Sequence, residues 1–384
     1  MNYGTYSVAS YGRMIRKSPR MTAYAKALRS VITPGCTVLD LGAGFGFFSL
    51  LSCQYGAGRV IAVEPAGAIE LGPELARANG CADRITFVRG VSRELGEDCR
   101  ADVIIADLRG SIPLFTHHIP TIVDARTRLL APEGVLVTQR DRLRCALVSD
   151  GSLAERFDPW DTNPFGVDLS LGRRFSVANT HKVSVTAEAQ ISDAADLGEL
   201  DYARISDPSF SGEVTLSATR AAQAHGVLVW FDAELAGGFG FSNAPEAPPL
   251  TYGQLFLPFE HPVDMSPGDT AEVSLDFCYS SGGYPISWKS RITRAGAPDL
   301  RYAQSTALSD FVTAADLRRR SGSYCPPVSA SVELDRYCLT RFDGATPLSA
   351  IAREVVERAP DRFQTEAEAL VYVADLAERY HAVS

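Results

Sequence analysis

The chain has 384 residues, of which 46% are hydrophobic and 22% charged, a composition typical of globular proteins with enough apolar material for two or three folded units. Lys and Arg number 37 against 46 Asp and Glu, and the net charge of −9 argues against nucleic-acid and membrane partners. No apolar run approaches the ~20 residues of a membrane-spanning helix, and the polar N-terminus lacks a signal-peptide pattern. We therefore expect a cytoplasmic protein.

The eight cysteines are scattered along the chain. No two of them have the short spacing of a zinc-binding pair, so we interpret them as reduced thiols and predict no metal site.

A glycine-rich turn follows the first predicted strand. Residues 36–41 form a short β-branched run that favours a buried parallel strand, and the turn Gly42-Ala43-Gly44-Phe45-Gly46 leads from it into an apolar helical stretch. A second run, 59–63, ends at Glu64, where a carboxylate can accept hydrogen bonds from both hydroxyls of a ribose. These features predict a nucleoside-binding edge.

Strands and helices alternate through the rest of this region. Apolar runs at 85–88, 103–106 and 135–137 alternate with helical stretches at 68–78 and 120–130, the pattern of a doubly wound α/β fold. The glycine spacing differs from the G-x-G-x-x-G of dinucleotide-binding folds, so no pyrophosphate is predicted.

Two motifs carry a resemblance to a known class of enzymes. Residues 38–44, Val-Leu-Asp-Leu-Gly-Ala-Gly, resemble the first motif of class I S-adenosylmethionine-dependent methyltransferases, and Ala62-Val63-Glu64 resembles the second. The resemblance implies S-adenosylmethionine as the cofactor. The residues it implies at the cofactor in this part of the chain are Asp40, Gly42, Gly44, Glu64, Val91 and Ser92, with Ser92 replacing a family glutamate on the adenine side.

Further segments are similar to the protein arginine methyltransferases. Residues 11–24 resemble the N-terminal helical element of that family, which implies Met14 near the cofactor sulfonium and Arg20 on its carboxylate. Residues 165–170 and 226–232 resemble stretches of the family's β-barrel. The segment 173–197 stands where the family inserts a dimerisation arm, so the resemblance implies a homodimer.

The acceptor pocket departs from the family pattern. Two glutamates nine residues apart grip the substrate guanidinium in that family, whereas this chain has Asp107 and Thr116. The expected Thr-His-Trp triplet is Thr251-Tyr252-Gly253. Because one carboxylate beside Arg109 would compensate a guanidinium poorly, we expect a non-arginine acceptor, a natural-product intermediate or modified peptide methylated on N or O. An unusual arginine methyltransferase and a catalytically silent cofactor-binding dimer are the alternatives.

Four side chains are candidates for the chemistry at the acceptor. Asp107 and one of His117 and His118 are expected to position the acceptor or remove its proton, although the two histidines can also be a surface pair before a helix. Tyr252 can orient an acceptor through its hydroxyl or pack in the barrel.

The fold class predicted is thus α/β, with three domains. Residues 1–150 form the N-terminal helix and Rossmann-like cofactor domain, residues 151–320 the β-barrel acceptor domain, and residues 328–384 a small helical module. This module is similar to winged-helix peptide chaperones of the pyrroloquinoline-quinone type, and the alternative is a helical cap.

Overall fold

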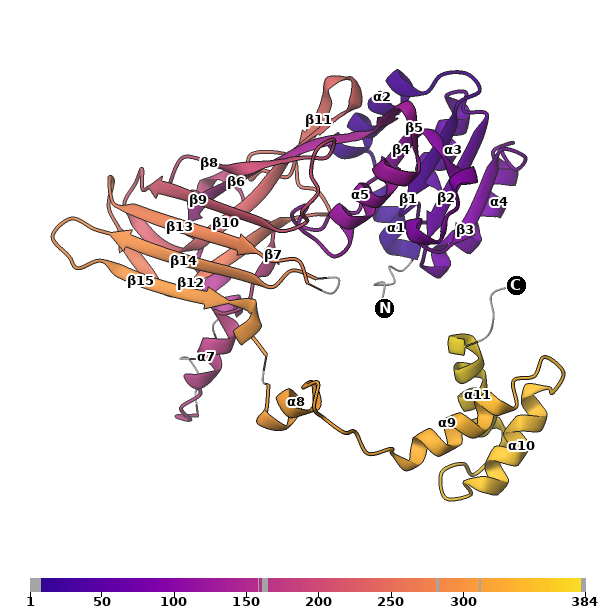
Figure 1. Ribbon diagram of the computed structural model, residues 1–384. Helices are drawn as coiled ribbons and strands as arrows, with labels where there is room; N and C mark the ends of the chain where they lie inside the picture. The colour runs from indigo at the N-terminus through magenta and orange to yellow at the C-terminus, as the bar shows by residue number, and fades with distance from the viewer. Residues whose placement is uncertain (1–7, 158, 161–164, 281–282, 311, 381–384) are drawn as a thin grey trace. The chain divides into compact units, whose positions relative to one another are not determined.

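The computed structural model describes residues 8–157, 159–160, 165–280, 283–310 and 312–380 (Figure 1). The chain divides into two compact units, Met1–Asp310 and Phe311–Ser384. Among the described residues, no helix is both long and apolar enough to cross a lipid bilayer.

The first part of unit 1 is built on a five-stranded parallel sheet with the strand order β3-β2-β1-β4-β5. The apolar runs that predicted these strands are buried under helices, as expected for a parallel sheet. The order reverses between β1 and β4, which opens a crevice at the carboxyl ends of these two strands. The strands are β1 (Thr37–Leu41), β2 (Arg59–Glu64), β3 (Ile85–Arg89), β4 (Ala101–Ala106) and β5 (Leu130–Leu136).

Helices connect and cover these strands (Figure 1). One predicted helix, 68–78, is interrupted: a 3₁₀ turn over Gly67–Leu71 precedes the α-helix Gly72–Ala78, because Pro73 cannot donate to the preceding turn. The connecting elements are α3 (Phe47–Gln54), η1 (Gly67–Leu71), α4 (Gly72–Ala78), η2 (Ser92–Glu94), η3 (Glu97–Cys99) and α5 (His118–Arg128).

The N-terminal element consists of two helices, α1 (Val8–Met14) and α2 (Pro19–Val31). Ser18 caps α2 by accepting a hydrogen bond from the Met21 backbone N–H, and Pro19 occupies the first turn, where no N–H is needed. The break between the helices places Met14 and Arg20 on separate segments.

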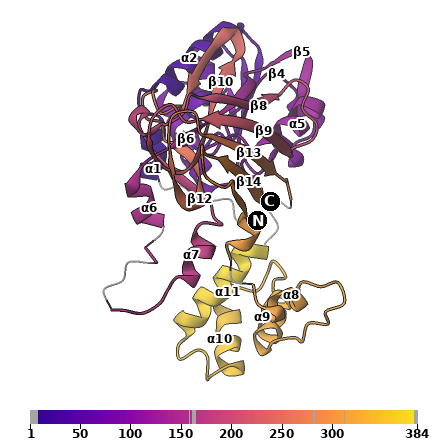
Figure 2. The same ribbon diagram turned by 90° about the vertical axis from the view of Figure 1, so that its left-hand side faces the viewer.

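Two antiparallel sheets form the barrel-like second part of unit 1 (Figures 1 and 2). The first contains β7-β12-β10-β6-β8, with β11 paired to β10, and the second has the order β15-β14-β13-β9. The burial of β13 alternates along the strand, the period of a sheet with one face in a core. The strands are β6 (Thr138–Val148), β7 (His181–Val183), β8 (Ala195–Asp201), β9 (Phe210–Ser217), β10 (Ala222–Leu235), β11 (Phe239–Ser242), β12 (Gln254–Met265), β13 (Thr270–Phe277), β14 (Ile286–Thr293) and β15 (Leu300–Ser305).

One hydrophobic cluster runs from the parallel sheet into the barrel. It includes Val38 and Ile104 of the parallel sheet and Leu143 and Phe231 of the barrel. The predicted α/β class with a Rossmann-like sheet and a barrel is confirmed.

Short helical elements accompany the barrel. They are α6 (Gly151–Phe157), α7 (Leu171–Ser176), η4 (Ala187–Ala189), η5 (Ala236–Gly238) and η6 (Thr306–Leu308).

The segment predicted as a dimerisation arm, 173–197, holds the end of α7, then β7, η4 and the start of β8. Here β7 pairs with β12 and β8 pairs with β6, so two short parts of the segment belong to the barrel sheet. Figure 2 shows α6 and α7 extending away from the sheets.

Unit 2 has its own small core, which contains Leu334, Cys338, Ile351, Val355 and Val373. Its helices are α8 (Ala314–Arg319), α9 (Ala330–Thr340), α10 (Leu348–Arg358) and α11 (Glu366–Tyr380). The expected helical C-terminus is confirmed. Residues 312–380 contain no strand, so this described range has no β wing of a winged helix.

Candidate active site

A cavity of about 610 Å³ opens at the carboxyl ends of β1, β2 and β4, where the strand order reverses. Its size suits a small-molecule site, and its wall combines the glycine turn, the N-terminal helices, the loop after β4 and the barrel. The structure brings every predicted site residue to this wall, namely Met14, Arg20, Asp40, Gly42, Gly44, Glu64, Val91, Ser92, Asp107, His117, His118 and Tyr252.

The turn after β1 requires its glycines. Gly42 and Gly44 have φ values of 71° and 60°, in the left-handed region. A Cβ on Gly42 would lie 2.1 Å from a Leu108 methyl carbon, and a Cβ on Gly44 would lie 2.7 Å from the Tyr11 ring. The turn therefore leaves bare backbone facing the cavity.

Glu64 ends β2 and fixes this turn. Its Oε2 accepts a hydrogen bond from the Gly44 backbone N–H at 3.0 Å, and its Oε1 accepts one from the Ala66 N–H at 2.9 Å. Each oxygen keeps a second lone pair, so the carboxylate can accept two ribose hydroxyls as well.

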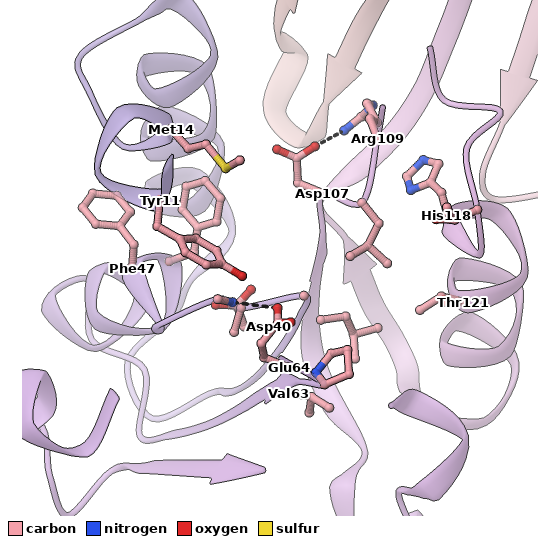
Figure 3. A pocket seen from close by; sticks show the side chains of 18 of the residues that line it. Tyr11, Met14, Asp40, Phe47, Val63, Glu64, Asp107, Arg109, His118 and Thr121 are labelled. Carbon is pink, nitrogen blue, oxygen red and sulfur yellow. Dashed lines mark hydrogen bonds and ion pairs between the residues drawn. The ribbon is translucent and has the colours of Figure 1, made fainter. Parts of the chain in front are cut away.

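Asp40 is buried at the end of β1 and accepts a hydrogen bond from the Ser49 hydroxyl at 2.7 Å. Burial raises its pKa to about 7, against the opposing effect of Ser49. Figure 3 shows Asp40 and Glu64 together below Tyr11 and Met14.

Ser92 can serve the adenine side because its hydroxyl hydrogen is already committed. Its Oγ donates to Asp124 Oδ2 at 2.7 Å, so the Oγ lone pairs are free to accept from an amino group. Arg128 holds Asp124 from the next turn of α5, with Nε–Oδ1 at 2.7 Å. Sequence reasoning missed Asp124, although its spacing of four from Arg128 on a predicted helix was visible.

Asp107 lies at the end of β4 at the centre of a cluster of charges. Arg20 contacts its Oδ2 at 2.6 Å, Arg109 donates to its Oδ1 at 3.0 Å, and the Tyr252 hydroxyl donates to it at 2.7 Å. Burial alone would raise the pKa of Asp107, but Arg20 and Arg109 outweigh it and hold that pKa well below its usual range. Asp107 is therefore a fixed negative charge and a weak base.

Arg109 has a carboxylate partner that the sequence did not reveal. It donates from Nε to Asp141 Oδ2 at 2.8 Å and from a terminal nitrogen to Oδ1 at 2.9 Å, and both side chains are fully buried. Asp141 comes from β6, far along the chain from the loop after β4, and no local motif marks it. The two arginines and two aspartates thus balance in charge.

His118 is buried rather than on the surface. Its Nε2 lies 2.9 Å from the Tyr202 hydroxyl, which itself donates to Asp141. Nε2 must therefore carry the hydrogen and donate. Burial, then Arg109, lowers the pKa of His118 to about 3. This corrects the expectation that His118 could act as a base near neutral pH, because its imidazole does not titrate there.

His117 and Thr116 complete the loop after β4. His117 Nδ1 lies 2.9 Å from the Tyr279 hydroxyl on the barrel side. Thr116, at the position of the second family glutamate, has a φ of 40°, which is strained for a non-glycine residue. Among the described residues, no group of three or more His, Cys, Asp or Glu side chains is arranged to hold a metal ion.

Comparisons with known families agree with both parts of unit 1. Residues 139–282 match the arginine methyltransferase oligomerization subdomain, and residues 22–155 match ribosomal protein L11 methyltransferase. An arginine N(omega)-methyltransferase of Streptomyces achromogenes is 28% identical over 68% of this chain and 74% of its own. Protein arginine N-methyltransferase 1 of Saccharomyces cerevisiae is 27% identical over 71% and 81%.

Solved structures share the fold. A Trypanosoma brucei PRMT1 enzyme–prozyme complex with AdoHcy matches with a TM-score of 0.72 and 24% identity over 79% of this chain and 99% of its own. Arabidopsis thaliana protein arginine methyltransferase 10 matches with a TM-score of 0.67 and 20% identity over 78% and 97%. This chain uses S-adenosylmethionine as its cofactor. It is a class I S-adenosylmethionine-dependent methyltransferase that resembles the protein arginine methyltransferases.

Proposed function

We propose that this enzyme methylates a guanidinium nitrogen of an arginine-type acceptor. The names of the curated relatives support arginine better than the non-arginine acceptor expected from the sequence. The observation that carries the proposal is the pairing of Arg109 with Asp141. The sequence suggested that Asp107 would have to compensate both Arg109 and a substrate guanidinium. Because Asp141 compensates Arg109, the charge of Asp107 can serve the guanidinium.

Asp107 has the properties of a cation-binding group. It stays ionised at neutral pH and lines the cavity, and its Oδ2 is shared with Arg20. Arg20 is the residue that the family resemblance assigns to the cofactor carboxylate. When Arg20 turns to that carboxylate, Asp107 Oδ2 becomes free to accept the N–H groups of a guanidinium.

The chain's own groups then bind and orient the acceptor. The glycine turn and Glu64 would hold S-adenosylmethionine, which would supply an electrophilic methyl group. Hydrogen bonds from two guanidinium N–H groups to Asp107 concentrate positive charge there and leave the remaining nitrogen as the nucleophile. Tyr252 fixes the Asp107 carboxylate, and His117 is the side chain that we assign to receive the released N–H proton.

A second candidate is a neutral amine or hydroxyl acceptor, which the replacement of a second carboxylate by Thr116 favours. The two curated relatives described above are named as methyltransferases, which supports an active enzyme over the catalytically silent alternative. A cytoplasmic location remains a prediction.

The test is methyl transfer from labelled S-adenosylmethionine to guanidines and, in parallel, to amines and alcohols of similar size, followed by mass spectrometry. Transfer to a guanidine nitrogen is expected. Transfer to amines or alcohols alone would refute the proposal in favour of the second candidate.

We also propose that the protein forms a homodimer. The match to an oligomerization subdomain supports it, as do exposed apolar side chains in the region before β7, including Leu169 and Leu171, the latter 63% exposed. Light scattering should give twice the chain mass, and Leu171→Glu should lower it, whereas a monomeric wild-type protein would refute the dimer.

A further inference from the structure

A lysine stands at the acceptor side of the cavity. Lys182 is the middle residue of β7, where it pairs with Leu255 of β12. Its neighbour Val183 is 3% exposed and packs in an apolar core. Because side chains alternate along a strand, Lys182 points to the opposite face, and there it lines the cavity.

The position of the Lys182 side chain is built into the barrel. Its Nζ donates to the Thr251 carbonyl oxygen at 2.5 Å. A Cβ on Gly253 would lie 3.3 Å from Lys182 Cγ and Cε and 2.4 Å from the Val183 carbonyl oxygen. Gly253 replaces the tryptophan of the family triplet, and this replacement leaves room for the lysine stem.

Lys182 differs from Arg20 and Arg109 in having no acidic partner among the residues that the structure describes. Arg20 and Arg109 face Asp107 and Asp141, whereas none of the described carboxylates lies within ion-pair distance of Lys182. An ammonium group has three donors, and Thr251 takes one. Burial lowers the Lys182 pKa. Lys182 is exposed and lines the cavity, and Thr251 is the one hydrogen-bond partner of its ammonium group among the described residues, so two donors are left for a ligand.

Lys182 and Asp107 flank the same tyrosine. Thr251, which holds the lysine, directly precedes Tyr252, whose hydroxyl bonds Asp107. The carboxylate and the ammonium group thus line one cavity and are both bonded to the segment Thr251-Tyr252, the ammonium through the backbone and the carboxylate through the tyrosine hydroxyl. A lysine at this place also repels cationic peptides.

We propose that the acceptor is a small guanidine bearing a carboxylate, an amino acid such as free L-arginine, and that Lys182 binds its carboxylate. This inference rests on the proposed guanidine methylation and specifies the substrate class. Asp107 takes the guanidinium end and Lys182 the carboxylate end, so the reacting nitrogen is placed by both groups.

The experiment compares L-arginine, agmatine, which lacks the carboxylate, and an arginine peptide blocked at both ends. For Lys182→Gln we expect a KM for L-arginine raised about tenfold with kcat unchanged, the size of one partly exposed charged hydrogen bond. The KM for agmatine should change less than about twofold, since it has no group for Lys182 to bind. Lys182→Arg should retain the L-arginine KM, and Lys289→Gln, an equal charge change on β14, should alter nothing.

The outcomes separate the two proposals. Equal KM changes for L-arginine and agmatine in Lys182→Gln, or no change in either, would overturn the role of Lys182. Transfer to the blocked peptide in preference to L-arginine would overturn the substrate class while leaving guanidine methylation intact. Absence of transfer to all three substrates would refute the proposed function and the inference with it.

Discussion

Replacing Asp107 by asparagine removes the charge at the centre of the acceptor site while keeping its shape. In the native protein, Asp107 takes charged contacts from Arg20 at 2.6 Å and from Arg109 at 3.0 Å. Breaking a buried ion pair typically costs ~3–5 kcal/mol. Arg109 keeps Asp141, and the Arg20 side chain is 13% exposed, so we expect a loss of about 2–3 kcal/mol of unfolding free energy.

The effect on activity follows from the hydrogen bonds to the acceptor. Losing one charged hydrogen bond to a guanidinium, worth ~1.5–3 kcal/mol, should lower kcat/KM by about 10- to 150-fold. S-adenosylhomocysteine affinity should not fall, because Arg20 is then released from Asp107. Denaturant unfolding, methyl transfer measured by mass spectrometry and titration calorimetry give the three quantities. Asp83→Asn, a surface change outside the cavity, is the matched control.

The pH dependence checks the assignment of Asp107 as a fixed charge. Its pKa is lowered in the folded state, so its contribution to stability is complete above the ordinary value of about 3.9 and is lost as the pH falls through the lowered value. The stability gap between wild type and Asp107→Asn should stay constant near neutral pH and narrow only below about pH 4. Wild-type turnover in Asp107→Asn with any guanidine acceptor would refute the reasoning.

Glu64→Ala should weaken S-adenosylhomocysteine binding by ~1.5–3 kcal/mol in calorimetry, and unchanged affinity would contradict its ribose role. Ser92→Ala and Asp124→Asn should each reduce the binding preference for the adenine cofactor over its hypoxanthine analogue. An equal loss of affinity for the two compounds would disprove the role of Ser92 at the adenine. Folding lowers the pKa of His118 from 6.5 to about 3, so on acidification the unfolded chain takes up this proton before the folded protein does. Between neutral pH and pH 5, His118 should therefore lower the free energy of unfolding by about 2 kcal/mol. Replacing His118 by Phe should flatten that slope in denaturant titrations. A chain ending at residue 310 should keep S-adenosylhomocysteine affinity, since unit 2 has a separate core, and loss of affinity would refute that independence.

The cofactor side of the fold could be predicted because its signals are local. The run 36–41 and the turn at Gly42 and Gly44 are contiguous in the sequence, and Glu64 ends the next strand. Strand, turn and acid fix one another's positions through backbone geometry, so a short stretch of sequence carries the information.

The acceptor side could be predicted only in part because it is assembled from distant segments. Asp107 was identified from its place after a strand, but Tyr252, which bonds Asp107, and Asp141, which pairs with Arg109, come from the barrel, and neither contact has a spacing rule. The electrostatic state of His118 was also inaccessible, since it depends on burial against Arg109 and on Tyr202. The charge of Arg109, which looked uncompensated in the sequence, is balanced by Asp141 through a tertiary contact.

The pairing of Arg109 with Asp141 also bears on how the two parts of unit 1 can evolve. The arginine follows β4 of the parallel sheet, the aspartate belongs to β6 of the barrel, and both are sealed from water. A cofactor domain joined to a barrel that lacks this acid would bury Arg109 with Asp107, which it shares with Arg20, but without Asp141. Breaking a buried ion pair typically costs ~3–5 kcal/mol, a large part of a domain's stability. Exchange of barrels between relatives should therefore succeed only where the incoming strand brings its own acid to that position.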